Sequence, residues 1–486
     1  MWNLLVDYWP HILAVISATM AIVAIVHVVM TKEDVRAAIG WAGVIVLSPI
    51  VGALVYAFAG VNRIRRATMI SERRRASADA VHHAMFDVSR ALVADLYGER
   101  FAAMKTLGDR VAKHAMTAGN SIRMLKDGDE TYAQMIACIE AARRSVIVET
   151  YIFDHDAIGL RLAEALISAH RRGVAVRVLI DAVGVRYTVP SIMGVLREGG
   201  VAVDLFNGNL IMGLRLPYAN LRTHRKIVVV DGGAAFVGGM NIRQGFTNEF
   251  TGGKRARDTH FRLEGPVVAD IFSVAAEDWR FTTGETLDGE AWRIEPPASA
   301  HFGAPVFIRP VPSGPDAALE TNHRMLMGAF SVAHRSIRIM SPYFLPDREL
   351  ISALATAGRR GVEIDIVVPA KNNLLLVERA MTAQFEQILK SYCRIWRATG
   401  PFDHSKLMAV DGVWAFVGSS NLDPRSLRLN FEIDIELLDR DFAAGIDARI
   451  DAAIAMAEPV TLDGLRARPF VLRLADRLLW LGSPYL

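Results

Sequence analysis

A short pattern that occurs twice constrains this chain more strongly than any other feature of its sequence. The first copy, HRKIVVVDGGAAFVGGMN, runs from 224 to 241, and the second, HSKLMAVDGVWAFVGSSN, runs from 404 to 421. In each copy a Lys follows the His by two positions, an Asp by seven and an Asn by seventeen. A single match of this kind is weak evidence. Two matches in register predict a duplicated unit with a candidate active site.

Each copy has the pattern of a β-hairpin. An apolar run leads from the Lys to an Asp-Gly turn, and a second apolar run follows the turn. Residues two apart on a strand point to the same face, so the His and the Lys project together. The Asn closes the return strand and comes back to the same point. The candidate site residues are therefore His224, Lys226 and Asn241 from one copy, and His404, Lys406 and Asn421 from the other.

This combination of side chains suits a phosphate. The Lys supplies fixed positive charge, the Asn donates hydrogen bonds, and the His serves as a nucleophile or moves a proton. Two such sets facing each other provide both sides of an in-line displacement at phosphorus, which then proceeds in two steps through a phospho-histidine. Help from the second His as acid and base is worth about 10²–10⁴ in rate. We expect no metal and no cofactor, because two Lys and two Asn already surround the phosphate.

The Asp of each copy, Asp231 or Asp411, belongs to the same motif and is counted with the candidate catalytic residues. Asp before Gly in a hairpin is, however, chiefly a turn-forming residue. We therefore expect a structural role for both Asp side chains rather than contact with a substrate. A lone His on a strand is also more often structural than catalytic. The doubled register is what favours catalysis here.

The N-terminus predicts a membrane anchor. No Lys, Arg, Asp or Glu occurs from 12 to 30, and a second uncharged stretch runs from 37 to 61. Each is close to the ~20 residues that cross a bilayer as a helix. A cleaved signal peptide is disfavoured, because no basic residue precedes the first run and a second run follows at once. The overall composition agrees, since 52% of the residues are hydrophobic.

Basic residues predict the orientation of these two spans. Six Arg residues follow the second span, against two basic residues, Lys32 and Arg36, between the spans. The positive-inside rule then places everything after residue 62 in the cytoplasm. The cluster either contacts anionic headgroups or serves only as a topology signal. Its members are Arg63, Arg65, Arg66, Arg73, Arg74 and Arg75.

From about 117 the chain alternates strand and helix, and the alternation occurs twice. RSVIVETYIF, GLRLAEALISAHRRG and VAVRVLID correspond to RSIRIMSPYF, RELISALATAGRRG and VEIDIVVP. Both helices end on Arg-Arg-Gly, a basic last turn followed by a glycine cap. We therefore expect an α/β fold of two tandem units that share one site, preceded by two transmembrane helices. The predicted parts are an anchor (1–61), a helical linker (62–116), a first unit (117–297) and a second unit (298–486), with EPPASAHFGAP at their boundary.

These stretches carry a resemblance. The doubled His-Lys-Asp motif resembles the phospholipase D superfamily. NSIRMLKDGDETY, ETYIFDHDAIGLRLAEAL, RDTHFRLEGPVV, PSGPD, SPYFLPD and NLDPRSLRLNFE resemble bacterial cardiolipin synthases, almost in order and over nearly the whole chain. The resemblance implies that Asp258 in RDTH and Glu432 in NFE hydrogen-bond the distal ring nitrogens of the two His residues. The alternative for each is a surface salt bridge with an Arg. One departure is Ala256, where the family usually has Trp.

The resemblance also implies an activity: transfer of a phosphatidyl group between two phosphatidylglycerol molecules, giving cardiolipin and glycerol at the bacterial inner membrane. We assign His224 as nucleophile and His404 as acid and base. A hydrolytic phospholipase, or a transferase that uses another alcohol, has the same chemistry. A nuclease is disfavoured by the formal net charge of only +3, and a non-catalytic scaffold by two intact motifs. The two Cys show no metal or disulfide pattern.

The C-terminal stretch RPFVLRLADRLLWLGSPYL mixes Arg with Leu, Phe and Trp at helical spacing. Two interpretations fit this pattern. One is an interfacial helix that lies on the bilayer, and the other is a helix packed on the α/β body.

Overall fold

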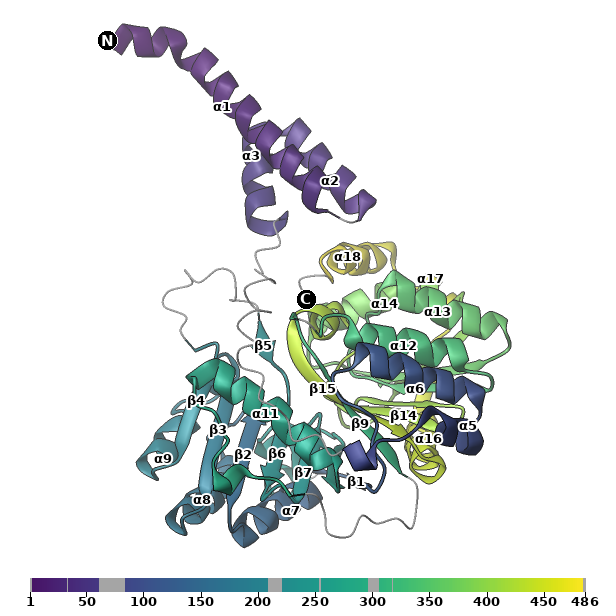
Figure 1. The fold of residues 1–486 in the computed structure, drawn as a ribbon. Coiled ribbons are helices and arrows are strands. Elements are labelled where there is room, and N and C mark those ends of the chain that lie inside the picture. The colour runs from purple at the N-terminus through teal and green to yellow at the C-terminus, as the bar shows by residue number, and fades with distance from the viewer. Residues whose placement is uncertain are drawn as a thin grey trace. The chain divides into compact units, whose positions relative to one another are not determined.

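A computed structural model describes residues 2–32, 34–60, 84–208, 221–252, 255–295, 306–316 and 318–483. The chain divides into two compact units (Figure 1). The first comprises 1–65 with 216–218, and the second comprises 66–215 with 219–486. The Arg cluster at 63–75 and most of the Pro-rich boundary stretch lie outside the described residues.

The first unit is helical. α1 (Trp2–Thr31), α2 (Val35–Leu47) and α3 (Pro49–Val55) pack around Val28, Ile45 and Tyr56. Within α1, the 24 residues from Tyr8 to Thr31 are long and apolar enough to cross a membrane. The second apolar stretch is helical but divided, because Pro49 lacks an N–H and begins a new helix after Ser48. Among the described residues, α1 is thus the one helix with the length of a span.

The second unit contains two sheets with the same strand order. The first sheet has the order β1 (Ser121–Leu125), β8 (His260–Glu264), β7 (Ala234–Gly238), β6 (Ile227–Val230), β2 (Ser145–Thr150), β3 (Ala175–Asp181) and β4 (Ala202–Phe206). In the second sheet the corresponding order is β9 (Phe307–Ser313), β15 (Asn430–Leu438), β14 (Trp414–Gly418), β13 (Leu407–Val410), β10 (Ser336–Met340), β11 (Glu363–Pro369) and β12 (Cys393–Ala398). Two short strands extend it, β16 (Ala457–Pro459) and β5 (Arg222–Thr223). The predicted tandem α/β duplication is confirmed.

Helices cover the sheets in each half. The first half has α7 (Gly128–Ala141), α8 (Ala157–Arg171), α9 (Ile192–Glu198), α10 (Asn248–Thr251) and α11 (Val267–Thr283). The second half has α12 (Thr321–Val332), α13 (Arg348–Arg359), α14 (Leu375–Leu389), α15 (Pro424–Arg428), α16 (Arg440–Ile454), α17 (Leu462–Arg466) and α18 (Phe470–Leu481). After α8 and α13 the glycines Gly173 and Gly361 both have a φ of 89°, as expected for the glycine caps.

Two helices from the predicted linker belong to the core of the second half. α5 (Arg90–Tyr97) contributes Val93, and α6 (Glu99–Val111) contributes Phe101 and Met104, to the hydrophobic cluster that also contains Phe330 of α12. Because these side chains are buried with the second sheet, 84–116 is not a free-standing connector. The sequence pattern had shown only that the segment is helical.

Candidate active site

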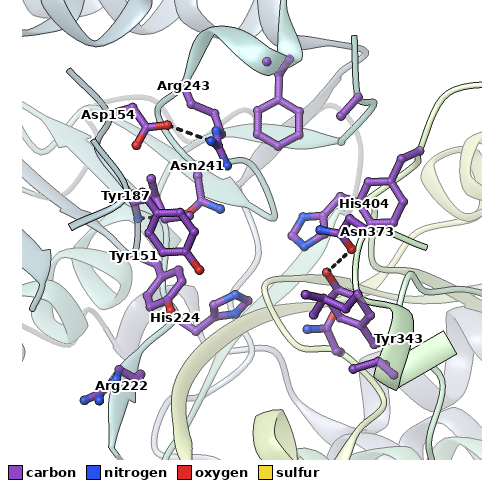
Figure 2. Close-up of a pocket in the computed structure, with 18 of the residues that line it drawn as sticks. Tyr151, Asp154, Tyr187, Arg222, His224, Asn241, Arg243, Tyr343, Asn373 and His404 are labelled. Carbon is purple, nitrogen blue, oxygen red and sulfur yellow. Dashed lines mark hydrogen bonds and ion pairs between the residues drawn. The ribbon is translucent and has the colours of Figure 1, made fainter. Parts of the chain in front are cut away.

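The two motif copies meet at one cavity between the two halves of the second unit. The cavity has a volume of about 1090 Å³, and both His224 and His404 line it, together with Asn241 and Asn421. Figure 2 shows the two imidazoles on opposite sides of this space. The decisive expectation from the sequence was that both His residues open into the same pocket, and they do.

Each candidate catalytic His is held to the opposite half by a hydrogen bond from its backbone N–H. The His224 N–H donates to the carbonyl of Phe431 at 2.8 Å, and the His404 N–H donates to the carbonyl of Arg257 at 2.7 Å. β5, just before His224, runs parallel to the start of β15. The two halves are thus joined at equivalent positions by equivalent bonds, which gives the site a local two-fold symmetry.

The imidazole rings are paired across the halves as well. His224 Nδ1 lies 2.9 Å from Glu432 Oε2, and His404 Nδ1 lies 2.8 Å from Asp258 Oδ2. Both carboxylates are fully buried. A carboxylate can only accept, so we place the proton of each ring on Nδ1. The lone pair on each Nε2 is then available to the cavity.

Both Lys side chains are buried beside their own His. Lys226 Nζ donates to the His224 carbonyl at 2.6 Å, and Lys406 Nζ donates to the His404 carbonyl. Lys406 Nζ also lies 2.9 Å from His404 Nδ1, but that nitrogen already donates to Asp258, so the carbonyl is the acceptor of the lysine. Each lysine is thus held beside its own His, and neither lysine is among the residues that line the cavity.

Burial shifts the pKa values of all four basic groups downward, and repulsion by a neighbouring lysine adds to the shift for both His residues and for Lys226. Burial, together with the smaller effect of Lys406, lowers the pKa of Lys226 to about 7 against the opposing effect of Glu432. Burial also lowers the pKa of Lys406. Burial and then Lys406 bring the pKa of His404 to about 4, and burial and then Lys226 hold the pKa of His224 well below 6.5. Such a site is built to receive an anion, which would relieve the repulsion.

The two Asn residues lie on the cavity wall. Asn241 Oδ1 accepts the N–H of Ile152 at 3.2 Å, so its amide NH₂ group remains to donate into the cavity. The Asn241 carbonyl accepts from the buried hydroxyl of Tyr132 at 2.5 Å, which fixes the end of β7. Asn421 holds the equivalent place in the second half.

Asp231 and Asp411 are in the hairpin turns and do not line the cavity. Both have a positive φ, 52° and 55°, followed by a glycine with positive φ, which is the turn geometry that Asp-Gly favours. Each carboxylate accepts three backbone N–H groups, two from the residues that precede β2 or β10 and one from the first residue of that strand. The donors are Arg143, Arg144 and Ser145 for Asp231, and His334, Arg335 and Ser336 for Asp411.

We expect Asp411→Ala to destabilise the fold rather than to disable the chemistry. The substitution leaves three N–H groups and the guanidinium of Arg100 without their acceptor, at a cost of about 2 kcal/mol or more. Thermal unfolding of Asp411→Ala, with Asp231→Ala as the matched variant, checks this. A loss of turnover as large as that of a His substitution, with an unchanged melting temperature, would contradict it.

Two tyrosines complete the site, and the sequence analysis assigned them no role. Tyr151 comes directly after β2, and Tyr343 comes three residues after β10, one position further along the aligned repeat. Their rings lie 5.4 Å from His224 and 5.9 Å from His404, centroid to centroid. The sequence carried a weak signal, because a tyrosine follows the first strand of each repeat, although the two tyrosines are one position out of register. Ala256, the departure noted from the family pattern, lies on the cavity wall.

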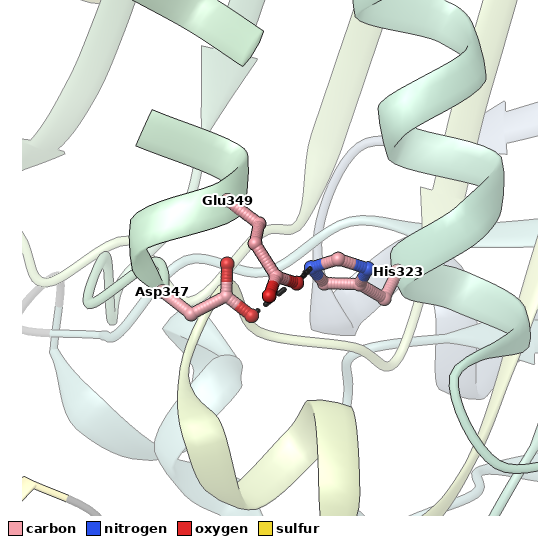
Figure 3. A group of neighbouring side chains, drawn as sticks. All are labelled: His323, Asp347 and Glu349. Atoms are coloured by element: carbon pink, nitrogen blue, oxygen red, sulfur yellow. Dashed lines mark ion pairs between the residues drawn. The ribbon is translucent and has the colours of Figure 1, made fainter. Parts of the chain in front are cut away.

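One group of side chains elsewhere has the composition of a metal site. His323 Nε2 lies 3.0 Å from Asp347 Oδ2 and 3.3 Å from Glu349 Oε2 (Figure 3). None of the three lines the cavity. The hydrogen bond to Asp347 raises the pKa of His323, so the group is already satisfied as an ion pair. Glu349 is 69% exposed, and we assign the group no part in the reaction.

Paired α/β halves with one His-x-Lys motif each around a common cavity define the phospholipase D superfamily. The family model described as "Cardiolipin synthase, PLD-like domain" matches residues 135–251 and 326–454. The model "Phospholipase D-nuclease N-terminal" matches 19–60. The chain belongs to the bacterial cardiolipin synthase family.

Curated relatives are similar over nearly the full length. Cardiolipin synthase A of Pseudomonas aeruginosa is 33% identical over 96% of this chain and 94% of its own. Cardiolipin synthase of Geobacillus sp. (strain WCH70) is 29% identical over 99% of this chain and 96% of its own. Among solved structures, phosphatidylserine synthase of Haemophilus influenzae Rd KW20 superposes with a TM-score of 0.59 at 15% identity, covering 79% of this chain and 100% of that one. This last likeness concerns the fold alone.

Proposed function

We propose that the protein is a membrane-bound phosphatidyltransferase that converts two phosphatidylglycerol molecules into cardiolipin and glycerol. The observation that carries this proposal is the pair of imidazoles that open into one cavity, each with Nδ1 on a buried carboxylate of the other half. Membership of the cardiolipin synthase family supports the choice of lipid.

In the first step, Nε2 of His224 attacks the phosphorus of one phosphatidylglycerol. The bond from phosphorus to the glycerol oxygen breaks, and His404 transfers its Nε2 proton to that oxygen. Lys226 and Lys406 neutralise the phosphate oxygens, and Asn241 and Asn421 hold them by hydrogen bonds.

In the second step, His404 takes the proton from the hydroxyl of another phosphatidylglycerol. The oxygen attacks phosphorus, the P–N bond to His224 breaks, and cardiolipin leaves with both imidazoles restored. His404 must be protonated at the start of the cycle, although its pKa is about 4 in the empty cavity. A bound phosphodiester anion offsets the field of the two lysines and raises this pKa.

The membrane setting is part of the same proposal. α1 supports an anchor, and we propose that the divided stretch at 37–61 forms a second span, with the catalytic body on the cytoplasmic side of the inner membrane. We also propose a division into 1–61, 62–116, 117–297 and 298–486, in which the helices of 84–116 pack on the second half. The sequence excludes neither a monomer nor an oligomer, and the proposal does not depend on either.

Product analysis on vesicles of pure phosphatidylglycerol tests the function. Cardiolipin and glycerol in equal amounts are expected. Phosphatidic acid as the main product would make the enzyme a hydrolase, and products only when another alcohol is added would make it a different headgroup transferase. Cleavage of DNA at moderate salt would favour a nuclease.

Turnover is expected to be insensitive to chelators. Two asparagines line the cavity and a buried lysine lies beside each of the two His residues, so we expect no divalent cation to be required to offset the phosphate charge. Activity is measured after exhaustive treatment with EDTA, with and without added Mg²⁺. A loss of activity with EDTA that Mg²⁺ restores would contradict this view of the phosphate site.

A further inference from the structure

α18 has one face packed on the body and one face open. Asp476, on the inner face, is 1% exposed and pairs with Arg379 of α14 at 3.4 Å and with Arg468 at 2.6 Å. The outer face is apolar, because hydrophobic residues recur on it at helical spacing. Its members are Phe470, Val471, Leu474, Leu478 and Leu481, whose exposed fractions are 73%, 73%, 45%, 60% and 69%. The two interpretations left open by the sequence therefore describe two faces of one helix.

α14 connects this helix to the cavity. The residues at its start, Leu374 and Val377, line the cavity wall. Leu374, Leu375 and Leu376 are themselves 47%, 62% and 52% exposed, so three consecutive leucines face water beside the cavity. Arg379, one turn beyond Leu375, reaches Asp476 in the middle of α18. The packed face of α18 thus lies within an arginine's length of the first turn of α14 at the cavity mouth.

The charged residues around α18 indicate what kind of surface would cover its exposed apolar side chains. Arg466, Arg468, Arg473 and Arg477 all lie on α17 and α18 or between them, whereas Asp476 is buried beneath the helix. Arg466 and Arg477 share Glu386 of α14, and Arg468 pairs with Asp476. Arg473 forms no ion pair within the described part of the chain and donates to the Arg466 carbonyl at 3.3 Å. An apolar face bordered by arginines is typical of a helix that lies in the headgroup region of an anionic bilayer.

We propose that the outer face of α18, with Leu374–Leu376 of α14, is a bilayer-docking surface that places the cavity mouth at the membrane. The docked face enters the boundary between headgroups and acyl chains. A lipid headgroup then reaches the cavity without its acyl chains leaving the bilayer. This inference rests on the proposed function for its consequence, but the docking itself is measured independently of activity.

The first test compares bilayer lipid with a soluble substrate. In the full-length protein, Leu474→Glu/Leu478→Glu places two carboxylates on the docking surface. Turnover of phosphatidylglycerol in vesicles is expected to fall by about tenfold or more, whereas turnover of short-chain phosphatidylglycerol below its micelle concentration is unchanged. Leu92→Glu on α5, where Leu92 is 41% exposed, is the matched control and keeps both activities. Equal loss on both substrates, or no loss on vesicles, would overturn the proposal.

The second test does not need turnover. Leu474→Cys is labelled with a fluorophore in a Cys138→Ala background, since the other cysteine, Cys393, is buried. With the full chain in phosphatidylglycerol bilayers, lipids brominated near the headgroup are expected to quench the label at 474 and not at Leu92→Cys. Absence of quenching at 474 would overturn docking even if the enzyme makes cardiolipin. Quenching with no activity on either substrate would instead overturn the proposed function.

Discussion

Replacing His224 with Ala is expected to abolish cardiolipin formation, with a loss of about 10⁴-fold or more in turnover. The reason is that no other nucleophile can form the P–N bond. His404, the other imidazole in the cavity, lies on the opposite side of the phosphate and is required as the acid. Glu432 Oε2 would lose His224 but still accepts the Ser419 hydroxyl at 2.6 Å, so the fold should survive. Turnover on phosphatidylglycerol vesicles, with melting temperature as control, measures the effect.

His404→Ala is expected to lose about 10²–10⁴-fold, because it removes the proton that the leaving glycerol requires. The two variants differ in what they accumulate. Phosphatidylglycerol labelled on phosphorus should leave a base-stable, acid-labile label on His404→Ala protein and none on His224→Ala protein. The reverse pattern would exchange the two roles without altering the mechanism. Normal turnover in either variant would contradict the mechanism itself.

The sequence was sufficient to predict the site residues whose positions follow from a local strand pattern. His224, Lys226 and the Asn at the end of the return strand are close in the chain, and a hairpin brings them together through local rules alone. The structure adds the connections that cross the halves. Glu432 is 208 residues from His224, and Asp258 is 146 residues from His404. No local pattern specifies which carboxylate meets which ring, because the packing of one half on the other decides it.

The helical segments show the same difference between what a local pattern predicts and what only the packing of the chain determines. The spacing of apolar residues predicted that 470–481 is an amphipathic helix, but not that its outer face stays open while Asp476 is buried on α14. Helical spacing in 84–116 likewise could not reveal that Phe101 and Met104 join the core of the second half. At 37–61 the absence of charge predicted one span. In the structure the stretch is divided, because Pro49 lacks an N–H and begins a new helix. The absence of charge alone does not predict this break.

Lys226→Met is expected to reduce kcat/KM by about 10²–10³-fold at neutral pH, because a buried ammonium next to the phosphate is lost. The wild-type enzyme should itself show the dependence on this proton. The pKa of Lys226 in the empty cavity is about 7. The ammonium form predominates below that pH, so kcat/KM should fall as the pH rises through about 7. Lys226→Arg, which keeps its charge, should move this limb to higher pH.

Lys226→Met is expected to increase the stability of the fold although it lowers kcat/KM. This difference separates the effect of the buried charge from the effect of side-chain packing. Burial depresses the pKa of Lys226 below the unfolded value of about 10.4. Between about pH 7 and 10 the unfolded chain therefore binds more protons than the folded one, so the free energy of unfolding rises with pH in this window. Lys226→Met removes that slope. The variant should exceed the wild type in stability most below pH 7, and the gain should diminish toward pH 10. Denaturant unfolding of both proteins across this range measures it. A flat wild-type kcat/KM between pH 6 and 9, or a variant that is less stable at pH 6, would show that Lys226 does not carry a destabilised charge in the empty cavity.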